Sequence, residues 1–302
     1  MATGDIIYGA DYNAVQTKVR EILGDGFPFG PTGTGDLSFG YNQPLLSGTV
    51  AILDPITKVQ WQHLADDINK AYIHQNNNTF TNYATISGEI SYTNLNDLNN
   101  VVTPMTLYQA TRVTAHPNQL TKNQLTGLTN TRSSTWGGIG NVGITGEFTL
   151  IWANNNDQNY FFNQGGSFQI TGFGPDQSGS VQDSDWQTFL TSFNCVIDYA
   201  RWSLVAAYPT FTEIYRITDT GSASGNYVTN YIAVSASRNV GSNALIVRVN
   251  YQDSHDPAGQ GTAGGPGPDT VSAGAGYNVY LSNASGAFVG SSITNSYTSG
   301  TL

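Results

Sequence analysis

The chain has few side chains that could activate a nucleophile, transfer a proton or hold a metal ion. Its four histidines are His63, His74, His116 and His255. None of them stands in the His-Glu-x-x-His spacing that places two imidazoles on one zinc ion. His255 lies between Asp253 and Asp256, a grouping that could bind a cation, although solvated polar residues at a strand end would give the same pattern. The single cysteine, Cys195, excludes an intrachain disulfide and a cysteine-rich zinc site.

Carboxylates are sparse in the second half of the chain. A glycosidase needs two of them that converge on one bond, and Asp183 and Asp185 are too close in sequence to face each other if they lie on one helix. The sequence has neither a Gly-x-Ser-x-Gly nucleophile elbow nor a phosphate-binding P-loop. We therefore expect no enzymatic activity, no cofactor and no resident metal, and a polysaccharide depolymerase is the least favoured alternative.

Aromatic residues suggest a different chemistry, the binding of sugars. Aromatic rings stack on sugar faces, and neighbouring amides bond the hydroxyl groups. The candidate glycan contacts are Tyr160, Trp202 and Tyr208. The competing interpretation, which we favour, is that strand aromatics fill a β core. Solvent-exposed aromatics at the loop tips of residues 154–160, 219–226 or 237–243 would favour sugar binding.

A repeated apolar pattern organises the first third of the chain. Its three copies are Ile7, Tyr12, Val15, Val19 and Ile22; Ile56, Trp61, Leu64, Ile68 and Ala71; and Ile90, Leu95, Leu98, Val102 and Met105. The last four members of each copy are spaced three, four and three apart, which predicts one apolar stripe along a helix. The leading isoleucine has the spacing of a hydrophobic staple. Because such helices cannot bury their stripes alone, we expect these candidate interface residues to pack on each other or on another chain.

The second copy also carries signals for its own ends. Thr57 and Gln60 have the spacing of a capping box, which predicts the start of a helix. Asn76, Asn77 and Asn78 predict the turn that ends it. Residues 1–115 are therefore expected to form a helical attachment or oligomerisation region, and the polar residues 116–135 a linker.

From Trp136 onward the spacing of apolar residues changes, from the three- and four-residue steps of a helix to every second residue, as in a β-strand. Alternation in Ile144–Trp152, Phe168–Ile170, Phe211–Ile217, Tyr227–Ser235 and Leu245–Tyr251, with turn clusters between these runs, predicts an antiparallel β-sandwich over residues 136–255. Asp185–Leu190 is expected to be one short helix, capped by Ser184 or Asp185. The fold class is therefore α+β, with small helical modules before a β-sandwich-like domain.

Residues 256–302 are expected to form a Gly-rich C-terminal arm. Tyr277, Val279 and Leu281 could form a strand there. This strand could pair locally with residues 287–293 or reach a neighbouring subunit.

Composition limits the classes of partner. Charged residues make up 11% of the chain, against a usual share of about 25%, whereas aromatics make up 12%. This favours a folded, β-rich protein over a disordered one. The net charge of −10 argues against a nucleic-acid surface, which needs a basic stripe. No apolar run approaches the roughly 18 residues of a membrane span, and we expect no signal peptide and no membrane insertion.

Several segments resemble virion structural proteins of tailed phages, in particular those of T4-like marine phages, including phages that infect cyanobacteria. They are Gly40–Gln43, Val50 and Ile52, Ile56–Leu64, Ala71–Gln75, Tyr160–Gly166, Phe168–Gly172, Trp186–Phe193 and Tyr227–Asp253. The resemblance implies a tail, baseplate, neck or fibre component that brings no catalytic residues with it.

The expected function is thus a structural part of a phage virion, made in the host cytoplasm and assembled by symmetric contacts. The expected partners are copies of itself, with a trimer favoured on the fibre analogy, and other virion proteins. The alternative is a host-receptor module of a tail fibre that binds a surface glycan.

Overall fold

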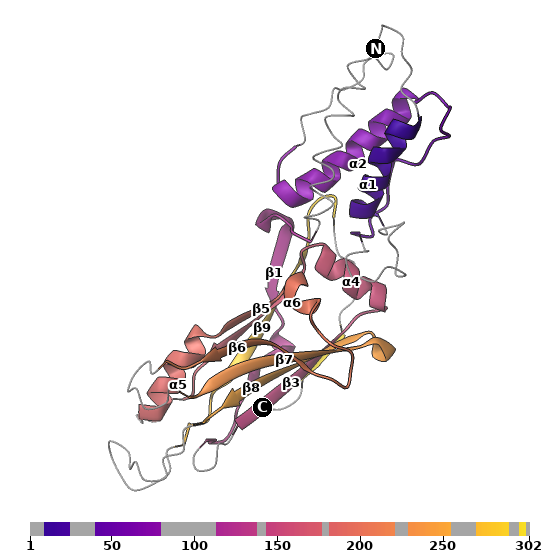
Figure 1. Cartoon of the computed structure of the whole chain (residues 1–302). Coiled ribbons are helices and arrows are strands. Elements are labelled where there is room, and N and C mark those ends of the chain that lie inside the picture. The colour runs from indigo at the N-terminus through magenta and orange to yellow at the C-terminus, as the bar shows by residue number, and fades with distance from the viewer. Residues whose placement is uncertain are drawn as a thin grey trace. The chain divides into compact units, whose positions relative to one another are not determined.

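The protein has a mixed α+β fold, with N-terminal helices followed by two antiparallel sheets in a sandwich-like arrangement (Figure 1). The predicted fold class is therefore confirmed. The structure is a computed structural model that describes residues 9–24, 40–79, 113–137, 143–176, 181–220, 229–254, 270–289 and 296–299. Ile7 and the third apolar stripe, from Ile90 to Met105, lie outside these residues.

The chain divides into two compact units that alternate along the sequence. The first comprises Met1–Thr121, Asn156–Gly166 and Asn283–Ser292; the second comprises Lys122–Asn155, Ser167–Ser282 and Ile293–Leu302. This differs from the expected division into consecutive segments, because short pieces from the middle and the end of the chain join the helical unit.

The first unit is built on α1 (Gly9–Leu23) and α2 (Lys58–Asn76), which contact each other. The stripe residues of both helices form its apolar core, together with Leu23, Tyr41, Ala284 and Val289. The capping box at the start of α2 is present as predicted, with the Thr57 side chain accepting from the Gln60 amide. Asn77 ends the helix in the left-handed conformation, with φ of 52°, which asparagine adopts more readily than most residues.

Two further elements contribute residues to the first unit. α4 (Asn155–Asn163) buries Phe161 and Phe162, although the sequence suggested a turn at its start and strand aromatics after it. The short η2 helix (Pro117–Gln119) leads into β1 (Leu120–Gln124), and the amide of Ser285 donates to the carbonyl of Gln119.

One sheet of the second unit has the strand order β1–β9–β4–β5, with β2 (Asn130–Thr131) also paired to β9 (Gly276–Ala284). β4 spans Ser167–Phe173 and β5 spans Asn194–Ile197; η3 (Thr126–Leu128) lies between β1 and β2. Residues 116–135, expected as a linker, thus carry two strands. The late strand, β9, pairs with β4 of the same chain over Ser167–Phe173, a pairing of distant segments that the local pattern did not predict.

The other sheet has the order β10–β3–β8–β7–β6. Its strands are β3 (Gly143–Ile151), β6 (Thr212–Thr218), β7 (Tyr231–Asn239), β8 (Ala244–Gln252) and β10 (Ser296–Ser299). The short η4 helix (Val240–Ser242) links β7 to β8, and Asn243 follows it with φ of 52°. Four of these strands lie where the alternating pattern predicts them, although β7 begins at Tyr231, inside the predicted run.

The two sheets meet through aromatic side chains. Phe148 of β3 lies 6.0 Å, ring centre to ring centre, from Tyr277 of β9, and the Tyr251 hydroxyl of β8 donates to the Gly276 carbonyl at 2.9 Å. α5 (Val181–Ser192) adds Trp186 to this core, and α6 (Tyr199–Trp202) follows β5. α5 begins before the predicted caps, so Ser184 and Asp185 lie inside the helix. Its buried face includes Gln182 and Asp183, which an apolar pattern does not show.

Candidate functional site

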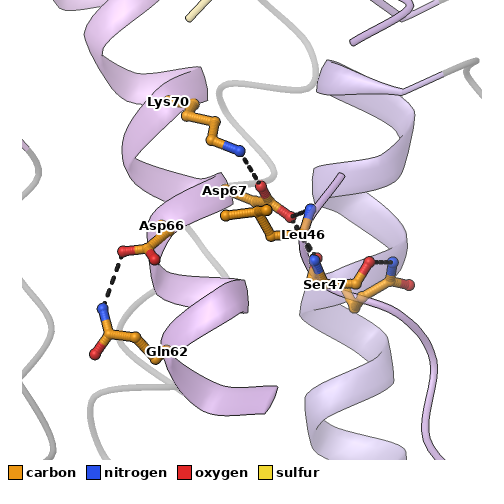
Figure 2. A network of polar contacts seen from close by, with 7 residues as sticks. Leu46, Ser47, Gln62, Asp66, Asp67 and Lys70 are labelled. Atoms are coloured by element: carbon orange, nitrogen blue, oxygen red, sulfur yellow. Dashed lines mark hydrogen bonds and ion pairs between the residues drawn. The ribbon is translucent and has the colours of Figure 1, made fainter. Parts of the chain in front are cut away.

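A buried carboxylate organises the surface of the first unit. Asp67 is fully buried on α2, and its Oδ2 accepts hydrogen bonds from the backbone amides of Leu46 (2.9 Å) and Ser47 (2.8 Å) and from the Ser47 hydroxyl (2.8 Å). Its Oδ1 forms a 2.8 Å ion pair with Lys70, one helical turn away. Figure 2 shows Asp67 reaching across to residues 46 and 47, while Asp66 points away and bonds Gln62. The carboxylate therefore ties a segment outside the helices to α2.

A second set of contacts ties the same segment to α1. The Asn13 side chain bonds both backbone groups of Val50, donating to the carbonyl at 2.8 Å and accepting from the amide at 3.0 Å. Gln16 donates to the Ser47 carbonyl at 3.4 Å. Burial, with the Asp67 charge nearby, raises the pKa of Tyr12 to about 12, so its hydroxyl stays protonated and donates to the Gln60 carbonyl at 3.1 Å. Residues 46–50 are thus fixed from both helices.

Immediately after this fixed segment the chain turns and exposes two large apolar side chains. The Asp54 amide donates to the Ala51 carbonyl at 3.0 Å, which places Ile52 and Leu53 at the centre of a four-residue turn. Ile52 is 64% and Leu53 84% exposed. We call residues 51–54 the apolar turn. Leu46 and Val59, on either side of it in sequence, are also at least half exposed.

The base of the apolar turn lies against the start of α1. A Cβ atom at Gly9 would stand 2.4 Å from the Ala51 carbonyl oxygen, a distance at which something must move. Glycine at this position allows the helix backbone to approach the turn directly. The start of α1 therefore packs against the backbone of the turn at Ala51, whereas the side chains of Ile52 and Leu53 face solvent.

Three segments far apart in sequence converge on Tyr41 and His74. The Tyr41 and Gln43 amides donate to the last two carbonyls of α1, and the Asn42 amide donates to the Gly24 carbonyl just after the helix. The Gln164 side chain donates to the Tyr41 carbonyl at 2.6 Å. His74 Nε2 lies 3.0 Å from the Gln164 carbonyl, and the His74 ring meets the Tyr41 ring edge-on at 4.8 Å. Burial lowers the pKa of His74 to about 4, so the ring is neutral near pH 7 and Nε2 donates this bond. The three segments are among those that carry the phage-protein resemblance, and here they form one packed junction.

The two predicted interface stripes that the structure describes, on α1 and α2, lie in the interior of the first unit. The stripe side chains of α1 and α2 are all at most 7% exposed. They pack on each other, which was one of the two expected outcomes, and so their surfaces are not available to a partner while the unit is folded. The two most exposed large apolar side chains of this unit within the described residues, Ile52 and Leu53, lie in the connecting segment, which has no helical period and which the stripe pattern did not identify.

The candidate glycan contacts do not form one exposed cluster. Trp202 is fully buried, with the Arg238 guanidinium 5.2 Å from its ring centre. Tyr160 is half-buried on α4 and belongs to the first unit. Only Tyr208 presents an open ring, at 53% exposure.

The acidic residues considered for chemistry have structural partners. Asp183 accepts from both the amide and the hydroxyl of Ser272 at 2.7 Å, and Gln182 donates to Asp253 at 2.8 Å. His255 and Asp256 lie outside the described residues. Within the described ranges, no three histidine, cysteine or acidic side chains gather where they could hold a metal ion.

Comparisons with protein-family models, with curated proteins and with solved structures gave no match. A search of the helices in the described part of the chain found none that is long and apolar enough to cross a membrane.

Proposed function

We propose that this protein is a structural component of a phage virion, in the tail, baseplate, neck or a fibre, and that it assembles through the apolar turn of its helical unit. The observation that carries the proposal is the combination of exposure and support at that turn. A buried carboxylate, an asparagine clamp and a glycine contact hold the segment in place, and the result is an 84% exposed leucine.

Two further features agree with this proposal. Three of the segments that resemble phage virion proteins converge at Tyr41 and His74 in one packed junction, as expected of a structural module. The two-sheet unit is held by apolar burial and by backbone pairing, and its one cysteine is free and buried. Such a domain stays folded in the oxidising medium outside a lysed cell without needing a disulfide.

The assembly is proposed to be a homo-oligomer, with a trimer favoured by analogy to fibres, that also contacts other virion proteins. Burial of one leucine side chain stabilises a contact by about 1.5–3 kcal/mol. Leu53→Ser should therefore weaken each contact that buries this side chain by roughly 10- to 100-fold.

The test measures the mass of the full-length protein in solution by light scattering over a range of concentrations. We expect an oligomer for the native chain and a shift towards the 32.3 kDa monomer for Leu53→Ser. Leu204→Ser is the matched control, because Leu204 is 68% exposed in the other unit. A native chain that stays monomeric, or an oligomer equally sensitive to both substitutions, would refute assembly through this turn. Immunogold labelling of particles from a lysate tests the virion location separately.

A further inference from the structure

The sheet β1–β9–β4–β5 has an outer face whose chemistry differs from the rest of the chain. In β4, β5 and β9 the inward side chains are apolar and buried; Phe168, Ile170, Cys195, Ile197 and Val279 are all 0% exposed. Because side chains alternate along a strand, the intervening residues point outward. We call the polar members of this set the polar face: Lys122, Gln124, Gln169, Thr171, Asn194, Asn278 and Tyr280. Val196 of β5, which stands opposite Gln169, is a partly buried apolar neighbour on the same side.

The polar face lacks the negative charge that dominates the chain. The five strands of this sheet contain no aspartate or glutamate, and Lys122 is their one charged residue. The whole chain has 21 acidic and 11 basic residues and a net charge of −10. The other sheet carries Glu147 and Glu213, each paired with an arginine. A lone ammonium group on a face without carboxylates, in an otherwise acidic chain, favours an anionic ligand.

Hydrogen bonds between neighbouring strands hold the polar groups in fixed positions. Gln124 donates to Asn278 at 2.9 Å, and Gln169 donates to Asn194 at 2.7 Å. The Lys122 ammonium bonds the Gln169 side chain and lies 4.8 Å from the centre of the Tyr280 ring. Tyr280 stands directly opposite Gln169 in the strand register. An amide uses only part of its bonding capacity in such a pair, and an ammonium group has three donors, so groups remain for a ligand.

We propose that the polar face binds an acidic polysaccharide, with Lys122 contacting a sugar carboxylate, the amides bonding hydroxyl groups and Tyr280 packing against a ring. Three properties of the face select this ligand. Its groups are amides and hydroxyls on a sheet surface with little exposed apolar area, which is unlike the apolar centre of a protein interface. One lysine is too little for nucleic acid, which requires a series of phosphate contacts. The absence of carboxylates in these strands removes repulsion of an acidic chain.

This inference extends beyond the proposed virion role and does not depend on it, since it concerns the second unit and the isolated chain. The test uses polygalacturonate, a polymer of acidic sugars, with dextran as the neutral probe, in a titration of the full-length protein at low salt. We expect the protein to bind polygalacturonate and not dextran. Added salt should weaken this binding, because it screens exposed charges. Binding to dextran with equal affinity, or no binding to polygalacturonate, would overturn the proposal.

Variants then locate the site. Lys122→Gln should lower the affinity for polygalacturonate at least tenfold, and Lys122→Glu should abolish binding. Lys58→Gln removes the same charge from an exposed position of the first unit and should leave the affinity unchanged. Tyr280→Thr keeps a strand-forming residue and tests the ring; it should also weaken binding, with a circular dichroism spectrum like that of the native protein. If the Lys122 variants bind as well as Lys58→Gln does, the polar face is not the site.

Discussion

Asp67 offers the sharpest test of how the helical unit supports its exposed turn. Replacing it with alanine removes a fully buried charge that accepts three hydrogen bonds on one oxygen and pairs with Lys70 on the other. The amides of Leu46 and Ser47 then lose their partner, and Lys70 loses its counter-ion. Breaking a buried ion pair from one side costs about 3–5 kcal/mol. This is a large part of the roughly 5–15 kcal/mol that stabilises a typical domain.

The free energy of unfolding must be measured for the first unit alone, and the distribution of tryptophans between the two units makes this possible. Of the five in the chain, only Trp61 belongs to the first unit; the others are Trp136, Trp152, Trp186 and Trp202. Fluorine NMR of fluorotryptophan-labelled protein in urea therefore follows the unfolding of each unit separately. We expect Asp67→Ala to destabilise the Trp61 transition by about 3–5 kcal/mol. The transitions of the other four tryptophans should move less.

Asp66→Ala is the control, because it removes a neighbouring carboxylate of the same helix. Asp66 accepts one hydrogen bond from Gln62, at 2.9 Å, and is half-buried. A pair of this kind contributes about 0.2–0.5 kcal/mol. If Asp67→Ala costs no more than Asp66→Ala, the contacts of Asp67 do not stabilise the unit and the argument for a supported turn fails.

Two further predictions concern groups that burial holds in their neutral form. Burial lowers the His74 pKa from 6.5 to about 4, so between these two pH values the unfolded chain binds a proton that the folded chain does not. The free energy of unfolding measured at Trp61 should therefore fall by about 3 kcal/mol as the pH falls from 6.5 to 4. His74→Phe should reduce this slope and His63→Gln should not, and a slope equal in all three proteins would contradict the assignment. Burial raises the pKa of Cys195 to about 12, so a thiol reagent at mildly alkaline pH should react with it only after urea is added; rapid reaction in the native protein would show that the site is open.

The local features of the helices could be read from the sequence. The spacing of Tyr12 and Val15, and of Trp61 and Leu64, reports which side of a helix is buried, and the structure buries all four. The Thr57 cap and the Asn77 turn depend only on neighbouring residues, so their signals are local. The alternation of apolar and polar residues predicted β3 and β8 correctly, because this signal also depends only on neighbouring residues.

The supported turn was not predictable in this way. Asp67 lies beside the stripe residue Ile68, and its sequence neighbours do not show that it reaches residues 46 and 47. Ile52 and Leu53 belong to no periodic element, so nothing local separates an exposed apolar pair from a buried one. The position of β9 between β1 and β4 likewise depends on contacts between distant segments.

The helical unit takes part of its core from Ala284 and Val289. During synthesis on the ribosome, α1 and α2 emerge long before these two residues do. The helices would therefore expose part of their apolar surface until residue 289 has left the exit tunnel. A chain cut short by premature termination before this point would display that defect, which gives the cell's quality control a means to remove incomplete copies before they are built into anything.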